Sequence, residues 1–529
     1  MRRLSGTLLL LLTLSLPLQA QGWTTVRRNA DKIVRALYFI ENRYVDSLDM
    51  DKMVDSMLDD LMNQLDPHST YIARGDVESV NEPLDGSFEG VGIEYAMIAD
   101  TLTVQSVIAG GPAEAAGLLA GDKIVAVDGQ PIAGTGLDAQ GVRALLRGPK
   151  GSTVTVSVVR NGYLRDYVIR RDTIPIESLD AAYKLDSDIV YLKLSRFSQT
   201  SDEEILKALR ILTGRTRPRG IIIDLRGNGG GFMHIAETIA DMFLEKGQVI
   251  VRVRGNDVDR DDEATGRGFY KKGPLVVLVD ENSASASEVL SGALQDWDRA
   301  VVVGRRTFGK GLVQQQYELP DGSEMRLTVA RYQTPSGRMV QSPYEQGKRA
   351  SYFRQARERY ERGESFCRDS IRMPDSLRFE TLKLGRPVYG IGGIVPDVFV
   401  PYDTTGYNRF FLEAVGGGLL TAYTYDYLDK HRGALQADDI EGFLKKYDKL
   451  EAEAFSGLLA YCAERGVEPG EGELEACEAV LKTRLKALLA RGPLGMNGYW
   501  QVINRERDPE FHRAVEIIES WTGDFPTGL

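Results

Sequence analysis

Cysteine is scarce in this sequence. The 529 residues contain three, Cys367, Cys462 and Cys477, which are too few for a disulfide framework. Cys462 and Cys477 flank a turn rich in Gly, Pro and Glu between two helical stretches, so they could pair in an oxidising compartment, and Cys367 would then stay free. The sequence leaves this pairing open. Disulfides are not needed for a stable fold, because a chain of this length can bury an extensive apolar core.

Long apolar runs and an excess of basic residues are missing as well. Beyond the N-terminus, no segment approaches the roughly 20 apolar residues that a membrane-spanning helix needs. The formal net charge of -11 argues against a nucleic-acid-binding protein. With 43% hydrophobic and 27% charged residues and no low-complexity tract, the composition is that of a globular chain. Its length predicts about two to four domains.

The N-terminus has the layout of a secretory signal peptide. Two arginines precede an apolar stretch over residues 8–18, and small or polar residues follow as far as Ala20. We therefore expect residues 1–20 to be a signal peptide and the protein to be exported, with the periplasm as its compartment. The alternative is an uncleaved anchor, which would leave the protein membrane-associated; the apolar part is short for a span.

The apolar pattern divides the remaining chain into four regions. Residues 26–72 form an N-terminal helical segment, in which apolar residues recur every three or four positions. Asp66 and Pro67 end its second helix. Residues 86–172 are short strand-like runs with many glycines and two short helical stretches. Residues 178–401 alternate apolar strands with amphipathic helices, which predicts an α/β domain with a largely buried sheet. Residues 407–529 are mostly helical and predict an added C-terminal helical domain.

Three serines alternate with alanines at the predicted start of a helix, in the segment ENSASASE at residues 281–288. Histidine is an improbable activator for any of them, because the chain has only four and none lies in a recognisable nucleophile context. A G-x-S-x-G elbow is also missing, although triad members converge in space rather than in sequence. Lysine is the other common base for a serine.

Lys310 lies between two glycines, twenty-five residues after Ser285. Glycines on both sides allow a tight turn that brings the amine close to another segment, and burial would lower the lysine pKa towards neutrality. Gln314, four residues later, could orient the amine without adding charge. Three consecutive glycines, 229–231, follow the strand GIIID, and their N–H groups could form an oxyanion hole with the N–H of Ala286.

Each of these segments also has a purely structural interpretation. Ser285 and Glu288 have the spacing of a capping box, in which serines serve as helix caps. The sequence GKG is often a surface turn, and GNGGG is often a phosphate-type loop or a simple turn. Nucleotide binding is not favoured, because the P-loop spacing G-x-x-x-x-G-K-[ST] and a Rossmann G-x-G-x-x-G are both missing.

Taken together, the motifs resemble the C-terminal processing peptidases, also called tail-specific proteases. The matching stretches are LDPHSTY, FEGVGIEY, GPAEAAGLLAGDKIVAVDG, IIIDLRGNGGG, ENSASASEVLSGALQD, GRRTFGKGLVQQ, LTVARYQTPSGR and GIVPD, in family order between residues 26 and 400. The resemblance implies a multidomain α/β fold: N-terminal helices, a β-rich PDZ domain with two short helices, an α/β serine-peptidase core and a C-terminal helical domain. It also implies an exported endopeptidase that uses no metal or organic cofactor.

The resemblance assigns roles to individual residues. Ser285 is implied as the nucleophile, Lys310 as the general base and Gln314 as the third catalytic member. The oxyanion-hole N–H groups are implied at Gly230 and Ala286. This chain has glycine at position 229, where proline is frequent in the family, which leaves the exact loop donor open.

The region 86–172 corresponds to the family's PDZ domain. Gly90, Val91, Gly92 and Ile93 would form the carboxylate-binding loop for a substrate's C-terminus, and the peptide would add as a strand beside them. From the residues alone, FEGVGIEY is a glycine-bent strand. The substrates implied are unfolded or tailed proteins with apolar C-termini.

Two further expectations concern regulation and assembly. Arg147 could face the catalytic cleft and couple tail binding to activity, or it could belong to a solvated basic turn. The N-terminal helices resemble family segments that often dimerise, which makes a homodimer plausible. A different class of function, a non-catalytic PDZ scaffold that binds exported tails, would be favoured if Ser285, Lys310 or Gln314 had been replaced, and all three are present.

Overall fold

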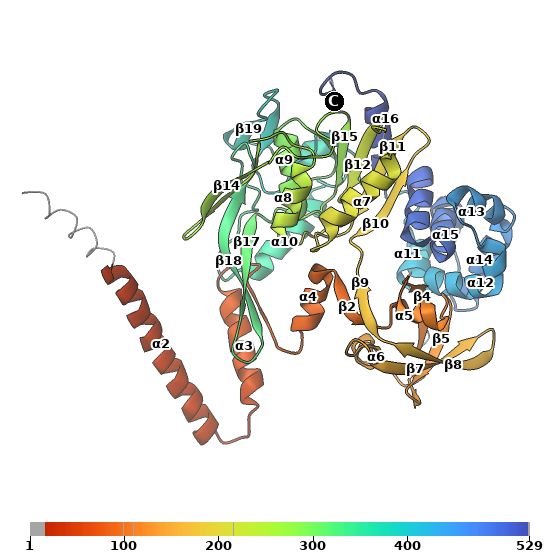
Figure 1. Cartoon of the computed structure of the whole chain (residues 1–529), viewed down its shortest axis with the longest axis horizontal. Helices are drawn as coiled ribbons and strands as arrows, with labels where there is room; N and C mark the ends of the chain where they lie inside the picture. Colours follow the sequence, from red (N-terminus) through yellow and green to blue (C-terminus); the bar gives the residue numbers. More distant parts are fainter. Residues whose placement is uncertain (1–15, 99, 109, 215, 527–529) are drawn as a thin grey trace, which may run out of the picture.

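The computed structural model describes residues 16–526 apart from residues 99, 109 and 215 (Figure 1). The expected signal peptide therefore lies largely outside the described residues. The two predicted N-terminal helices are α2 (Leu16–Arg43) and α3 (Met50–Asn63), and Asp49 caps α3 by accepting from the N–H of Lys52. Helix α2 extends away from the rest of the molecule (Figure 1). Within the described ranges, no helix has both the length and the apolar character that crossing a membrane requires.

A β-rich domain follows the N-terminal helices. Its sheet has the strand order β3-β4-β5-β7-β8, and β6 pairs with β5. The elements are β3 (Ile93–Ile98), β4 (Thr101–Val107), α5 (Pro112–Ala116), β5 (Lys123–Val127), β6 (Gln130–Pro131), α6 (Ala139–Leu146), β7 (Thr153–Arg160) and β8 (Tyr163–Arg170). The predicted strands and the two short helices are confirmed. Strand β3 is an edge of this sheet, so one side of its backbone is not paired within it.

The chain enters and leaves the β-rich domain through two adjoining strands. Helix α4 (Val77–Asp85) leads into β2 (Ser87–Gly90), and β9 (Asp172–Pro175) leaves the domain. Strands β2 and β9 pair antiparallel with each other, with Ser87 opposite Pro175. Entry and exit therefore lie side by side.

The α/β region is built on a six-stranded sheet of order β10-β11-β12-β15-β16-β21, parallel except for the β10–β11 pair. Its strands are β10 (Leu179–Lys184), β11 (Ile189–Leu194), β12 (Gly220–Asp224), β15 (Leu275–Val279), β16 (Val301–Gly304) and β21 (Val398–Phe399). Every residue of β11, β12, β15 and β16 is buried, as expected for a sheet covered on both faces.

Different parts of the chain cover the two faces of this sheet. One face packs against α7 (Ser201–Thr213), α8 (Met233–Asp241) and α9 (Ala286–Asp296), the helices predicted between the strands. The other face packs against α16 (Pro509–Glu519), whose Phe511 and Ile518 join Ile222 and Leu278 in one buried cluster. The expected separation between a core at 178–401 and a helical domain at 407–529 is thus incomplete, because α16 is part of the core.

A second sheet lies beside the first. It has the order β1-β18-β13-β14, with β17 paired to β18. The strands are β1 (Thr70–Ile72), β13 (Val249–Gly255), β14 (Asp259–Glu263), β17 (Leu312–Glu318) and β18 (Glu324–Gln333). Strand β13 begins with the apolar run VIVRV and belongs to the region 178–401, for which we expected an α/β domain with a largely buried sheet. It pairs antiparallel with β14 and β18 instead.

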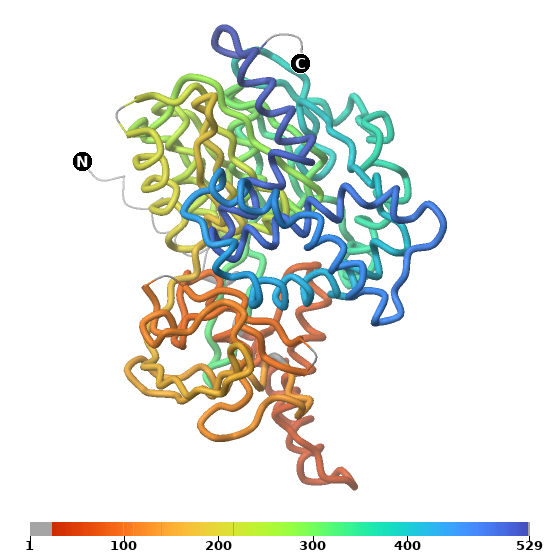
Figure 2. The backbone as a smooth tube through the Cα atoms, turned by 90° about the vertical axis from the view of Figure 1, so that its right-hand side faces the viewer, coloured from red at the N-terminus to blue at the C-terminus, as the bar shows by residue number. Residues whose placement is uncertain are grey.

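The C-terminal region is helical, as predicted. Its remaining helices are α11 (Arg409–Gly416), α12 (Leu419–Leu435), α13 (Ile440–Tyr447), α14 (Glu451–Ala463) and α15 (Glu473–Arg507), which is kinked at Gly495. The smaller elements before them are α10 (Arg349–Glu361), β19 (Arg378–Glu380) and β20 (Pro387–Tyr389). Cys462 and Cys477 are buried in this region as free thiols, and Cys367 is exposed. Figure 2 shows the C-terminal helices α11 to α15 in blue, beside both the α/β region and the β-rich domain.

Candidate active site

Ser285 lies in the turn that joins β15 to α9 and has a strained backbone. Its φ of 56° and ψ of -113° are unusual for a residue with a side chain, and such strain is common at functional sites. The neighbouring serines have structural partners: Ser283 Oγ donates to Leu225 O at 2.8 Å and Ser287 Oγ donates to Asn228 O at 2.9 Å. Both are fully buried, whereas Ser285 lines a cavity of about 620 Å³.

Lys310 and Gln314 line the same cavity. The Lys310 Nζ donates to Gln314 Oε1 at 2.9 Å, and Gln314 Nε2 donates to His68 O at 2.6 Å. Burial lowers the pKa of Lys310, and the positive charge of Arg326 lowers it further. The lysine amine is thus oriented by a neutral amide in a place that favours its uncharged form.

The glycines around Lys310 are required by close packing. A Cβ atom at Gly309 would lie 2.1 Å from Ser342 Oγ, and the φ of Gly309 is 96°. A Cβ at Gly311 would lie 2.6 Å from Gln341 N. The lysine segment can therefore fit against its neighbours only without side chains on either side of Lys310.

Glu288 connects the serine segment to the lysine segment. Its carboxylate accepts from the N–H groups of Ser285 and Lys310, each at 2.8 Å. It also accepts from Thr307 Oγ1 at 2.6 Å and Gly309 N at 2.7 Å. Burial raises the pKa of Glu288 to about 7 despite these four donors. From the sequence we expected a helix-capping residue; only the structure shows that it fixes both segments.

Tyr332 is a second residue that the sequence did not single out. Its hydroxyl lies 2.6 Å from Lys310 O and 3.0 Å from Ser285 O, within hydrogen-bond distance of both carbonyls, so it also joins the two segments. Tyr332 is buried on β18. The only signal in the sequence was its place in the motif LTVARYQTPSGR.

The glycine-rich loop after β12 packs directly against Ser285. A Cβ at Gly230 would lie 2.8 Å from Ser285 Cβ and 2.9 Å from Ala284 O, which shows how closely the two segments approach. The Gly230 N–H, which we expected to be an oxyanion donor, donates to Asn228 Oδ1 at 2.9 Å. In this conformation it is therefore engaged within its own loop. Ala286 is buried as the first residue of α9, and both it and Gly230 line the cavity.

The rest of the cavity wall is mostly apolar with two guanidinium groups. Phe232, Met233, Val289, Leu312 and Val313 supply the apolar part, and Arg196 and Arg326 supply the charge. Pro83 and Leu84 of α4 also line the cavity, as do the polar side chains of Ser195, Gln315 and Gln316. Within the described ranges, no group of three or more His, Cys, Asp or Glu side chains could hold a metal ion.

The predicted carboxylate loop joins β2 to the edge strand β3. Gly90 ends β2, Gly92 has a φ of 80°, and Ile93 begins β3. The carbonyls of Val91 and Gly92 accept from Ala113 N at 2.9 Å and Ile108 N at 3.0 Å, which fixes the loop against the start of α5. Val91 and Ile93 are buried.

Arg147 is not among the residues that line the catalytic cavity. It forms an ion pair with Glu82 of α4, and its guanidinium lies 5.2 Å from the centre of the Phe88 ring. The residues after Glu82, Pro83 and Leu84, do line that cavity. Arg147 thus contacts the helix that lines the cavity, and its coupling to the catalytic site stays a prediction.

Comparisons with known proteins agree with this arrangement. Residues 188–345 match the model of peptidase family S41, and residues 103–160 match a PDZ domain. The chain is 34% identical over 333 residues to the carboxy-terminal processing protease CtpB of Bacillus subtilis (strain 168), covering 62% of this chain and 69% of that protein. This chain belongs to the carboxy-terminal processing protease family. It is accordingly a serine-type peptidase with a PDZ domain.

Three other comparisons cover different shares of the chain. The carboxy-terminal-processing protease of Bartonella bacilliformis is 36% identical over 310 residues, which covers 57% of this family member and 70% of that protein. A solved photosystem II D1 C-terminal processing protease has 27% identity, a TM-score of 0.36, and coverage of 72% of this chain and 87% of its own. Residues 410–495 match a family of unknown function.

Proposed function

We propose that this protein is an exported endopeptidase that binds the C-terminal tails of protein substrates through its PDZ domain and cleaves them by a Ser/Lys mechanism. The observation that carries the proposal is the convergence of Ser285, Lys310 and Gln314 on one cavity. Family membership supports the reaction class. Export rests on the N-terminal sequence, and residues 1–20 are its proposed signal peptide.

The proposed reaction begins with a proton transfer. The neutral amine of Lys310 takes the proton of Ser285 Oγ as this oxygen attacks the peptide carbonyl carbon. The C–N bond then breaks, the Lys310 ammonium gives its proton to the leaving amine, and an acyl-enzyme ester remains on Ser285. Water hydrolyses the ester with Lys310 again as the base, which restores the serine hydroxyl. Gln314 keeps the amine oriented throughout.

The oxyanion would be held at the start of α9. Ala286 is the first residue of that helix, so its N–H belongs to the terminal groups without a partner within the helix, and the helix dipole favours negative charge there. Gly230 would contribute its N–H once the peptide turns away from Asn228 Oδ1. We therefore propose Gly230 as the loop donor, together with this rotation of its peptide.

Substrate capture is proposed at the edge of the PDZ sheet. The side of β3 that does not face β4 offers backbone groups to an added strand, and Gly90, Val91, Gly92 and Ile93 would receive the terminal carboxylate. We take residues 86–172 as the recognition domain and unfolded or tailed proteins with apolar C-termini as its ligands. A homodimer through α2 is supported by the exposure of Val34, Tyr38 and Phe39.

Mass spectrometry of a poorly folded, tailed substrate tests the proposal. We expect Ser285→Ala and Lys310→Ala to abolish cleavage, a far larger loss than the roughly 10²- to 10³-fold that removal of one oxyanion donor costs. Ser283→Ala and Ser287→Ala are the matched controls and should retain measurable cleavage. Normal cleavage by Ser285→Ala would refute the assignment. Binding of an intact tail by the wild type, without cleavage, would support the alternative of a non-catalytic scaffold.

A further inference from the structure

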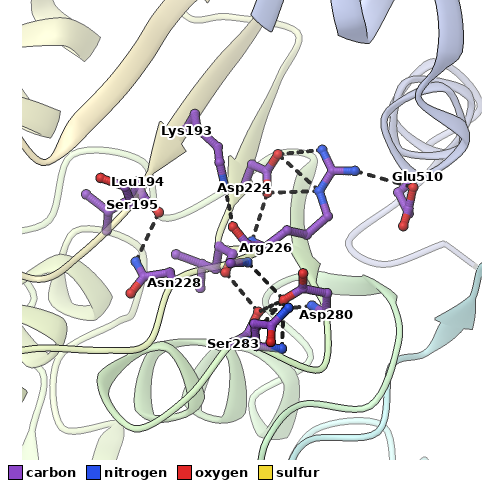
Figure 3. A network of polar contacts seen from close by, with 12 residues as sticks. Lys193, Leu194, Ser195, Asp224, Arg226, Asn228, Asp280, Ser283 and Glu510 are labelled. Carbon is purple, nitrogen blue, oxygen red and sulfur yellow. Dashed lines mark hydrogen bonds and ion pairs between the residues drawn. The ribbon is translucent and has the colours of Figure 1, made fainter. Parts of the chain in front are cut away.

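The first residues of α16 bind an arginine in the loop that packs on Ser285. Arg226 makes a two-point contact with Asp508, from Nη1 to Oδ1 at 2.8 Å and from Nη2 to Oδ2 at 2.7 Å. Its Nη1 also lies 3.3 Å from Glu510 Oε2, and its other side is bound by Asp224. Figure 3 shows Arg226 between Asp224 and Glu510. Two-point contacts of this kind fix both the position and the plane of a guanidinium.

Glu510 ties α16 to the other two segments of the site. Its carboxylate pairs with Arg305, which lies five residues before Lys310. Arg305 also donates to Glu281 Oε2 at 2.7 Å, and Glu281 lies four residues before Ser285. The loop at 226–231, the serine segment and the lysine segment therefore all meet at the start of α16.

The acidic side chains that bind Arg226 are buried, so each charge needs its partner to compensate it. The side chains of Asp224, Asp508 and Glu510 are 0%, 3% and 8% exposed. Burial raises the pKa of Asp224, but Arg226 and Lys193 outweigh it and hold the pKa well below its usual range. Removing one partner from such a network leaves an uncompensated charge, so the remaining partner moves or takes up water.

The loop is held from both sides, and Arg226 is its outer attachment. On the inner side, Gly227 N donates to Asp280 Oδ1 at 2.9 Å and Asn228 Nδ2 donates to Leu194 O at 3.0 Å. Four residues after Arg226, Gly230 has almost no space between itself and Ser285. A shift of Arg226 is therefore passed to the wall of the cavity beside the nucleophile.

We propose that Asp508 and Glu510 are positioning residues of the peptidase site, which hold the glycine loop and the lysine segment in register from the C-terminal region. The inference rests on the proposed function of Ser285. It gives the last helix of the chain a role in catalysis that neither the peptidase match at residues 188–345 nor the match of unknown function at 410–495 includes.

The test uses the full-length protein and the variants Asp508→Asn and Glu510→Gln. Asparagine keeps the capping function of Asp508, which accepts from Phe511 N at 2.9 Å, while it removes the charge. We expect kcat for a peptide substrate to fall by about 10-fold, with KM changed by less than about 3-fold, because the shape of the site and not substrate binding is affected. Asp508→Glu, which keeps the charge, should recover most of the loss.

The control is Glu516→Gln on the same helix, where Glu516 pairs with Arg513 at the surface. It should leave kcat unchanged. Thermal unfolding measured beside the kinetics identifies any variant that is unfolded at the assay temperature, and Glu510→Gln then decides in place of Asp508→Asn. The inference is overturned if the folded variants keep the wild-type kcat, or if Asp508→Glu is as slow as Asp508→Asn. Cleavage by Ser285→Ala, run alongside, would instead reject the proposed function.

Discussion

The Nζ of Lys310 lies 2.9 Å from Oε1 of Gln314, so the amine is oriented by an uncharged acceptor. A carboxylate in the same place would bind the ammonium more strongly and would hold the proton on it. The neutral amide allows burial to keep the lysine pKa low. This pairing leads directly to a prediction about pH dependence.

Gln314→Glu should move the activity profile to higher pH. The new carboxylate raises the pKa of Lys310, so a smaller fraction of the amine is neutral at a given pH. On the acid limb, each unit of increase in that pKa lowers kcat/KM by about tenfold. The measurement is kcat/KM against pH, in which the acid limb should shift upward by about one unit or more. Gln315→Glu adds the same charge at the next position of β17, on an exposed side chain that lines the same cavity, whereas the Lys310 amine is bound by Gln314; it serves as the control, with a smaller shift expected. An acid limb at the same pH in both variants would contradict Lys310 as the base.

Glu288→Gln should remove a pH dependence from stability. The folded-state pKa of Glu288 is raised from 4.5 to about 7, so the folded protein binds this proton more tightly than the unfolded chain. The resulting stabilisation is fully present below about pH 4.5 and is lost as the pH rises through about 7, an effect on the order of 3 kcal/mol. Urea unfolding of both proteins at pH 5 and pH 8 measures it. The wild type should lose stability relative to the variant at the higher pH.

The matched subtraction matters in that experiment, because burial also raises the pKa of Glu237 to about 7. Glu237 is present in both proteins, so its contribution cancels. If the difference between the wild type and the variant is the same at both pH values, Glu288 does not titrate as the structure indicates.

Gly230→Ala should inactivate the enzyme while Gly229→Ala causes a far smaller loss. A Cβ at Gly230 would press on Ser285 Cβ at 2.8 Å, and the φ of 106° is unfavourable for alanine. Gly229 has open space at the corresponding position. We expect a loss of at least about 10²-fold in kcat/KM for Gly230→Ala, comparable to disruption of an oxyanion hole. Equal activity of the two variants would mean that the loop does not support the nucleophile.

Arg147→Ala should affect tailed substrates more than short peptides. The ion pair with Glu82 connects the PDZ domain to α4, which lines the catalytic cavity through Pro83 and Leu84. Because the pair is partly exposed, the expected loss is about 3- to 10-fold in kcat/KM for a tailed protein. The double variant Arg147→Glu with Glu82→Arg should restore activity. A loss of the same size for a short peptide without a PDZ-binding end would speak against coupling.

Local patterning predicted the elements of the fold better than their partners. The apolar run LVVLV lies in the region 178–401, for which the sequence predicted a largely buried sheet, and it forms the centre of that sheet as β15. The run VIVRV has a similar composition but lies in the second sheet, because strand pairing depends on neighbours that are distant in sequence. The amphipathic pattern of α16 predicted a helix, whereas its place against Leu278 is a contact across more than 200 residues.

The site was predictable to the extent that motifs carry it. Ser285, Lys310 and Gln314 were named through the family resemblance, and they line one cavity. The role of Glu288 was not visible, because a capping box and a link between two segments have the same local spacing. The contact between Asp508 and Arg226 joins residues 282 positions apart, and Asp508 lies outside every motif. The hydrogen bond from Gly230 N to Asn228 depends on a side-chain rotation that a loop motif does not determine.

The pairing of strands β2 and β9 brings the two ends of the PDZ domain together. The N–H of Ile176 donates to the carbonyl of Gly86 at 2.8 Å, so the two ends of the PDZ insertion touch where they meet the core. An inserted domain whose ends adjoin can be replaced by another domain without a change in the path of the surrounding chain. Outside this junction the exchange would break the ion pairs of Arg147 with Glu82, Arg491 with Glu94 and Lys123 with Asp426, and the packing of Ile98 on the C-terminal helices. An exchange of the PDZ domain at this junction would thus leave the chain of the peptidase core continuous.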